Sequence, residues 1–226
     1  MPPHNKHTLK RYDTGLEAIR ASIMEMGGLV ELQFQHALHA LCETDTHLAR
    51  QVMDQDQRVN QLEVKIDGLC CSAIARYQPT AGDLRALVTA TKIIVPLERI
   101  GDEAKKIAHM AEQRALQYQL AMPRFSEIRH SAEATRKMLQ EVLDSFARLD
   151  SASARRVMEE NDLLKKEFDS ILRNLVVYMS ANPRAISASL DILFVAKAIE
   201  RIVDHIRLIS ELVIEASDRH IEVQPA

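Results

Sequence analysis

Apolar side chains recur every three or four residues along almost the whole chain, which is the spacing of amphipathic helices. In the clearest stretch, one helix face carries Ile93, Leu97, Ile100, Ala104, Ile107 and Ala111. No stretch alternates polar and apolar residues for long enough to predict a strand. The pattern therefore predicts an all-α protein.

Capping residues and prolines divide this pattern into six helices. We expect the first helix at about 13–41, and the second from the capping residues at 43–46 to about residue 77. The other four are expected at about 80–117, 126–149, 151–179 and 183–217. Asp150 is placed to cap the fifth helix, and Asn182-Pro183 is a typical start for the sixth. Gly27-Gly28 is expected to weaken or bend the first helix, because glycine is a poor helix former.

A five-residue phrase occurs twice in the chain. The two copies read Glu98-Arg99-Ile100-Gly101-Asp102 and Glu200-Arg201-Ile202-Val203-Asp204, an offset of 102 residues (200 − 98). The likeness extends upstream, where Asp67 matches Asp169 at the same offset. Internal repetition of this kind predicts a duplicated helical unit. We therefore expect two tandem three-helix bundles, residues 9–120 and 121–218, each with a core of its own.

Composition excludes several classes of protein. The 226 residues carry a nearly balanced net charge of −3, which does not indicate a nucleic-acid-binding face. The three cysteines, Cys42, Cys70 and Cys71, fit neither a disulfide framework nor a zinc site, so we expect reduced thiols in a cytoplasmic protein. The chain opens without a signal-peptide pattern and has no apolar run of about 18 residues, so any membrane association is expected to be peripheral, through partners.

Each phrase places two carboxylates one helical turn apart, away from the apolar stripe. If the second and third helices lie side by side, Glu63 and Asp67 approach Glu98 and Asp102. Oxygen ligands without histidine or cysteine suit hard cations such as Mg²⁺, Ca²⁺, Mn²⁺ or iron. The alternative is a solvated face of salt bridges, since Arg99 follows one acid directly and lies one turn before the other.

The second copy of the acidic set differs from the first. Asp169 stands where the first copy has Asp67, but Lys165 stands where the first copy has Glu63. We expect Lys165 to lie near Glu200 and Asp204 and to neutralise part of their charge. A protonated ammonium cannot ligate a metal, so the first repeat should bind a divalent cation more tightly than the second.

Signatures of catalysis are missing from the sequence. There is no glycine-rich phosphate loop and no nucleophile elbow. The pair Glu127-x-x-His130 occurs once, whereas a di-iron site of the ferritin type needs two such pairs. We therefore predict no catalytic residues. Two alternatives stay open: a metal-dependent phosphoester hydrolase, and a helical scaffold whose acids are only surface charge.

Four segments together resemble the PhoU family of bacterial phosphate-signalling proteins, over roughly residues 9–218. They are residues 26–31 (MGGLVE), 60–67 (NQLEVKID), 78–85 (QPTAGDLR) and 97–102 (LERIGD). The resemblance implies a duplicated three-helix bundle in the cytoplasm. It also implies an adaptor between the ATPase subunit of the phosphate ABC transporter and a sensor histidine kinase of the PhoR type, which keeps the phosphate regulon off when phosphate is plentiful. It leaves a homodimer open.

Metal binding through paired acidic motifs is a further implication of this resemblance. The motifs correspond to Glu63, Asp67, Glu98, Asp102, Asp169, Glu200 and Asp204, and the metal would be iron, manganese, magnesium or zinc. The chain departs from the family pattern at two positions. Lys165 replaces an acid and Val203 replaces a glycine. Both departures fall in the second repeat and place the second metal site in doubt.

Overall fold

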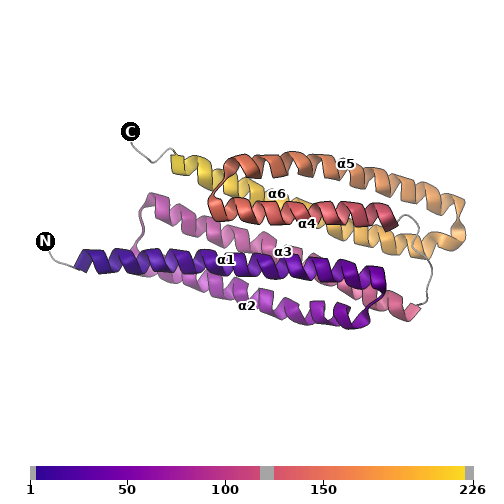
Figure 1. The fold of residues 1–226 in the computed structure, drawn as a ribbon, viewed down its shortest axis with the longest axis horizontal. Coiled ribbons are helices and arrows are strands. Elements are labelled where there is room, and N and C mark those ends of the chain that lie inside the picture. Colours follow the sequence, from indigo (N-terminus) through magenta and orange to yellow (C-terminus); the bar gives the residue numbers. More distant parts are fainter. Residues whose placement is uncertain (1–3, 118–124, 222–226) are drawn as a thin grey trace.

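The computed structural model describes residues 4–117 and 125–221, and these ranges fold into long helices without any strand (Figure 1). The helices are α1 (His4–Glu43), α2 (Thr46–Tyr77), α3 (Ala81–Gln117), α4 (Phe125–Arg148), α5 (Ser151–Ala181) and α6 (Ile186–Ile221), with a short 3₁₀ helix, η1 (Pro183–Ala185), before the last. The all-α prediction is confirmed. Within the described ranges, no helix is both long and apolar enough to cross a membrane.

Local capping interactions explain the ends of α2 and the start of α5. Asp45 accepts a hydrogen bond from the Leu48 N–H at 2.9 Å, and Asp150 accepts one from the Ser153 N–H at 3.1 Å. Each therefore satisfies one of the unpaired donors at the start of its helix. Gln78 closes α2 in the left-handed conformation, with φ of 46°. The sixth helix departs from the prediction, because a 3₁₀ turn comes before it where a regular first turn was expected.

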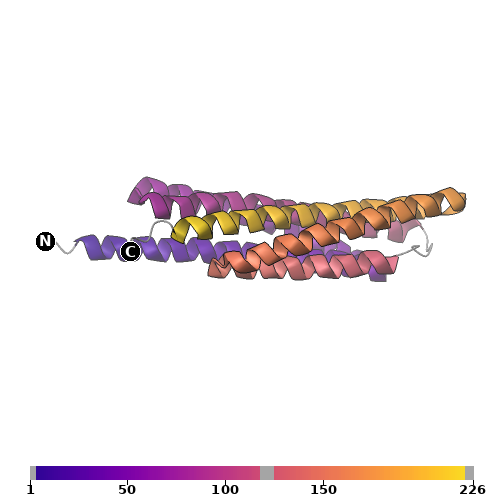
Figure 2. The same cartoon turned by 90° about the horizontal axis from the view of Figure 1, so that it is seen from above.

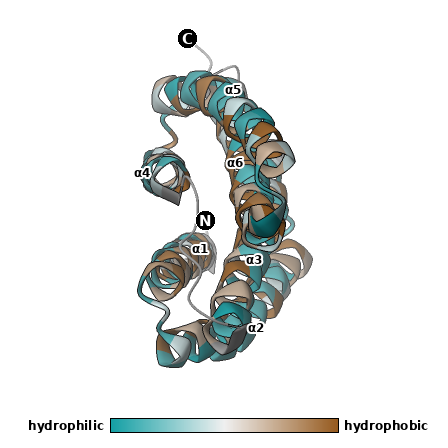
Figure 3. Cartoon of the chain, turned by 90° about the vertical axis from the view of Figure 1, so that its right-hand side faces the viewer, coloured by the Kyte–Doolittle hydropathy of each residue, from teal (hydrophilic) through white to brown (hydrophobic). Residues whose placement is uncertain are grey.

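The helices form two three-helix groups that lie against each other. The first, α1, α2 and α3, and the second, α4, α5 and α6, each pack within themselves, while α3 contacts α6 and α1 contacts α4. Viewed end-on, α2, α3, α6 and α5 form a curved row, with α1 and α4 on one side of it (Figure 3). From above, the molecule is long and narrow (Figure 2). The predicted pair of three-helix bundles is thus confirmed, and α3 and α6 meet at its centre.

The apolar interior runs continuously from one bundle into the other. The fully buried side chains of both halves, such as Phe34 in α1 and Phe168 in α5, belong to one contiguous cluster. The expectation of two separate cores is wrong, because the apolar faces of α3 and α6 are buried against each other as well as inside their own bundles. The predicted boundary between residues 120 and 121 lies outside the described residues.

Gly27 of α1 packs against Leu143 of α4. A Cβ placed on Gly27 would lie 2.6 Å from a methyl carbon of Leu143, whereas one on Gly28 would meet nothing within 4 Å. The helix α1 runs through both glycines without interruption, so the expected weak point is instead a packing site. The absence of a side chain at Gly27 allows the two bundles to come together.

Candidate functional site

The acids of the first repeat lie on neighbouring helices, as the sequence predicted. Glu63 and Asp67 belong to α2, and Glu98 and Asp102 belong to α3, which packs along it. The side chain of Glu98 is 18% exposed and that of Asp102 is 31% exposed, while Asp67 is open to solvent. Glu63, Glu98 and Asp102 are therefore partly shielded from solvent, whereas Asp67 is not.

Glu98 carries the clearest electrostatic signature of the acidic set. Burial raises the pKa of its carboxyl group, and the negative charges of Asp102, Glu63 and Asp56 raise it further, while Arg99 opposes them. A carboxylate near other carboxylates is harder to ionise. Glu63, Glu98 and Asp102 thus share one electrostatic neighbourhood. Asp67 is not among the charges that act on Glu98; it lies near Cys70, whose pKa is raised first by burial and then by the charge of Asp67.

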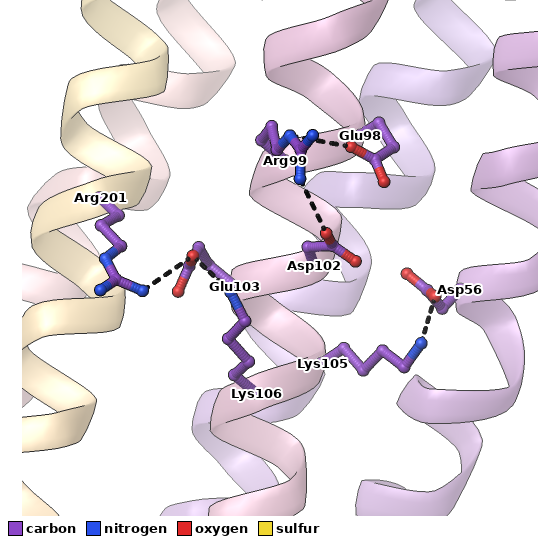
Figure 4. A network of polar contacts seen from close by, with 8 residues as sticks. All are labelled: Asp56, Glu98, Arg99, Asp102, Glu103, Lys105, Lys106 and Arg201. Atoms are coloured by element: carbon purple, nitrogen blue, oxygen red, sulfur yellow. Dashed lines mark hydrogen bonds and ion pairs between the residues drawn. The ribbon is translucent and has the colours of Figure 1, made fainter.

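Basic side chains occupy part of this neighbourhood (Figure 4). Arg99 lies between the two α3 acids, 3.5 Å from the Glu98 carboxylate and 3.7 Å from that of Asp102. Lys105 donates to Asp56 of α2 at 2.6 Å. Because the Arg99 side chain is 59% exposed, its ion pairs are weak and the side chain can turn away from the acids.

Asp56 of α2 is an acid near this site that the sequence analysis did not assign to it. Only 3% of the residue is exposed, and its Oδ1 has no hydrogen-bond partner among the described residues. Burial of a carboxylate depends on how α2 packs against α3, which periodicity alone does not reveal. The one sign in the sequence that Asp56 could be buried was its position at the edge of the apolar stripe of α2.

The second repeat holds its acids in ion pairs. Lys165, which corresponds to Glu63 of the first repeat, forms a salt bridge with Asp204, as predicted. Lys197 donates a hydrogen bond to Glu200 at 2.6 Å. Asp169 is exposed on α5. Two lysines therefore stand where a cation would have to bind, and the residues of this repeat do not fit a metal ion.

The first repeat fits a hard cation by the chemistry of its donors. Its carboxylates lie close enough to raise the pKa of Glu98, a penalty that a divalent ion removes. The side chains as they stand are not assembled into a cage. In the described part of the chain, no three His, Cys, Asp or Glu side chains are arranged to hold a metal ion. Binding there would use two carboxylates at most together with water, a mode that Mg²⁺ commonly adopts.

A polar cluster joins the two repeats where α3 crosses α6 (Figure 4). Glu103 of α3 is 5% exposed and accepts from Lys106 at 2.8 Å and from Arg201 of α6 at 3.5 Å. His205 lies nearby, and burial lowers the pKa of its imidazole, although the charge of Glu103 opposes this. The sequence analysis missed this cluster, because the contact between Glu103 and Arg201 depends on how one repeat packs on the other.

Comparison with known proteins places this arrangement in a family. The model of the PhoU domain matches the chain twice, at residues 23–111 and 128–213. The phosphate-specific transport system accessory protein PhoU of Escherichia coli strain K12 is 40% identical over 210 residues, covering 92% of this chain and 86% of that protein.

Solved structures agree with this assignment. The crystal structure of PhoU from Pseudomonas aeruginosa superposes with a TM-score of 0.88 at 42% identity and covers 92% of this chain and 99% of its own. The phosphate transport system regulatory protein PhoU from Streptococcus pneumoniae has the same fold, with a TM-score of 0.83 at 21% identity over 91% of this chain and 96% of its own. On the two family-model matches and the close relatives, the chain belongs to the PhoU family.

Proposed function

We propose that the chain is an accessory regulator of phosphate uptake and signalling, and that it acts by binding partner proteins rather than by catalysis. The observation that carries this proposal is the likeness to phosphate-specific transport accessory proteins along 92% of the chain, through both repeats. A shared fold alone would not assign a function. Here the two matched ranges, 23–111 and 128–213, include the positions of both acidic phrases.

The proposed partners are the ATPase subunit of a phosphate ABC transporter and a sensor histidine kinase of the PhoR type. Both contacts would be made in the cytoplasm, and membrane association would come through the transporter. The long, narrow shape supports such bridging, because two partners can contact different parts of it without colliding (Figure 2). The charge balance of −3 over 226 residues gives no large basic face that would favour nucleic acid instead.

Capture of the two partners by the tagged full chain tests the adaptor role. The chain should retain both the transporter ATPase and the kinase from cells grown in high phosphate, and deletion of its gene should activate a phosphate-starvation reporter. Retention of neither partner, with the reporter unchanged, would contradict the proposal. Turnover of a generic phosphomonoester with Mn²⁺ by the purified chain would instead support the hydrolase alternative.

Metal binding by the first repeat is the second part of the proposal. Glu98 and Asp102 would hold one divalent ion together with water, after Arg99 turns away, while Glu63 and Asp67 lie on the neighbouring helix α2. The ion would neutralise a patch of carboxylates and so change the charge that a partner meets. In the second repeat, Lys165 and Lys197 already neutralise the acids, as their ion pairs show.

Titration calorimetry with Mn²⁺ on matched double variants tests this asymmetry. Glu98→Gln/Asp102→Asn should weaken binding at least about tenfold, since it removes both charged ligands. Glu200→Gln/Asp204→Asn, the same change in the other repeat, should alter the affinity less than about twofold. Equal losses in both variants would refute the asymmetry. Failure of the unmodified chain to bind Mn²⁺ would show that the acids serve in surface salt bridges.

A further inference from the structure

A cavity of about 620 Å³ opens between α3 and α6, across the seam of the two repeats. This volume lies in the range of small-molecule sites, roughly 300–1,000 Å³. Its wall is strongly cationic, with Lys105, Lys106, Lys197 and Arg201 around it and His109 beside them. Among the described residues, Asp102 is the single acid in this wall. A ligand that enters the cavity therefore meets mainly positive side chains.

Carboxylates outside the cavity hold these cations in place. Lys105 donates to Asp56 at 2.6 Å, and Glu103 accepts from Lys106 at 2.8 Å and from Arg201 at 3.5 Å. Asp56 and Glu103 are 3% and 5% exposed, and neither lines the cavity. An ion pair with a buried anchor limits the freedom of the cation and so reduces the entropy lost when a ligand is bound.

The lysines around the cavity have hydrogen-bond donors left over that a ligand could use. An ammonium group carries three donors, and Lys105, Lys106 and Lys197 each direct one to a carboxylate in the described structure. Their side chains are 45%, 53% and 46% exposed. The three lysines line the cavity, whereas the carboxylates that accept from them, Asp56, Glu103 and Glu200, do not. Several oxyanions on one ligand could be bound at the same time.

The cavity also has an apolar wall that a simple anion would not use. Phe194 is 56% exposed, although burial of a phenylalanine is normally favourable. Met53 of α2 and Met110 of α3 complete this part of the lining. Methionine side chains adapt to the shape of a ligand, and an exposed aromatic ring stacks on a flat heterocycle. The wall thus favours a ligand with a planar apolar part next to its negative charge.

We propose that this cavity binds a nucleoside polyphosphate, with the phosphates between the α3 and α6 cations and the base against Phe194. Inorganic phosphate would satisfy the cations but leave the Phe194 surface uncovered. A neutral heterocycle would cover that surface but leave the cations without an anion. The proposal goes beyond the regulatory role above and does not depend on it, since nucleotide binding can be measured on the purified chain without metal or partners.

Calorimetric titration of the purified full chain with ATP, inorganic tripolyphosphate and adenosine, in buffer with EDTA, tests the proposal. ATP should bind with a stoichiometry near one and more tightly than either of the other two probes. Phe194→Ala should weaken ATP binding about fivefold or more, the effect of losing one base stack, and leave tripolyphosphate unchanged within about twofold. Lys197→Gln should weaken ATP and tripolyphosphate alike, by about fivefold.

Two control variants match these changes outside the cavity. Leu208→Ala removes an exposed apolar side chain from the same helix, and Lys166→Gln removes an exposed lysine from α5. Neither should change the ATP affinity by more than about twofold. Absence of saturable ATP binding at 1 mM (about the weakest affinity worth assigning to a site) would overturn the proposal. Equal effects of Lys166→Gln and Lys197→Gln would also overturn it, because they would indicate attraction to net charge alone.

Discussion

Replacement of Gly27 by alanine tests the contact between α1 and α4 that brings the two bundles together. The new Cβ would lie 2.6 and 2.9 Å from the methyl carbons of Leu143 and 3.3 Å from its Cγ. Overpacking of a buried site costs about 1–3 kcal/mol. Alanine in place of glycine inside a helix returns about 1 kcal/mol. We expect the free energy of unfolding to fall by up to about 2 kcal/mol.

The neighbouring Gly28 provides a matched control in the same turn of the same helix. Because nothing lies within 4 Å of its Cβ position, Gly28→Ala should stabilise the protein by about 1 kcal/mol. The two adjacent substitutions should therefore differ by about 1–3 kcal/mol in urea unfolding followed by circular dichroism. Truncation of Leu143 to alanine should remove this difference, since the clash disappears. Equal stabilisation by both glycine replacements would refute the assigned contact.

Three further predictions concern single side chains. Cys71, which is exposed, should react with a thiol reagent in the folded protein, whereas Cys70, whose pKa burial raises to about 11, should react only on unfolding; equal rates would contradict this. Hydrogen bonds from Ser153 lower the pKa of Asp150. The ionised carboxylate therefore stabilises the folded state at any pH above its ordinary pKa of 3.8, and this stabilisation is lost as the pH falls below that value. Asp150→Asn should reduce that acid dependence while keeping the cap, and an unchanged pH profile would count against it. Glu103→Leu should change the free energy of unfolding by less than about 1 kcal/mol, because its cationic partners Lys106 and Arg201 are 53% and 61% exposed and stay hydrated without it; a loss above about 2 kcal/mol by urea titration would contradict this.

The helices were predictable because their signals are local. The spacing of apolar residues predicted helices, and capping residues such as Asp150 predicted where helices start. A cap depends on side chains within about three residues, which the sequence shows directly. The first helix begins at His4 rather than near residue 13, because residues 4–12 lack an apolar stripe and periodicity could not extend the helix there. At the sixth helix, Asn182-Pro183 predicted the position of the start but not its form, because Pro183 begins a 3₁₀ turn and the α-helix follows at Ile186.

The packing of one repeat on the other was not predictable from the sequence. The 102-residue offset shows that the halves are alike but contains no information on which faces meet. Glu103 is an example, since its ion pair with Lys106 of α3 would form equally well on an exposed surface, and its contact with Arg201 of α6 depends on how the repeats pack. Gly27 is another, because a glycine pair inside a helix suggests weakness until Leu143 is seen against it.

The contact between α3 and α6 also shows a difference in charge between the two repeats. At the 102-residue offset, Glu103 corresponds to His205 and Arg99 corresponds to Arg201. A symmetric seam would pair Glu103 with Arg201 and an acid at position 205 with Arg99, but only the first pair forms in the described structure. Burial lowers the pKa of His205, so its imidazole is neutral at pH 7 and offers Arg99 no counter-charge. Arg99 instead lies against Glu98 and Asp102, on the acids of its own repeat. With a histidine at position 205, Arg99 has no acid at the symmetry-related position of α6, and its ion pairs among the described residues are with the acids of its own helix.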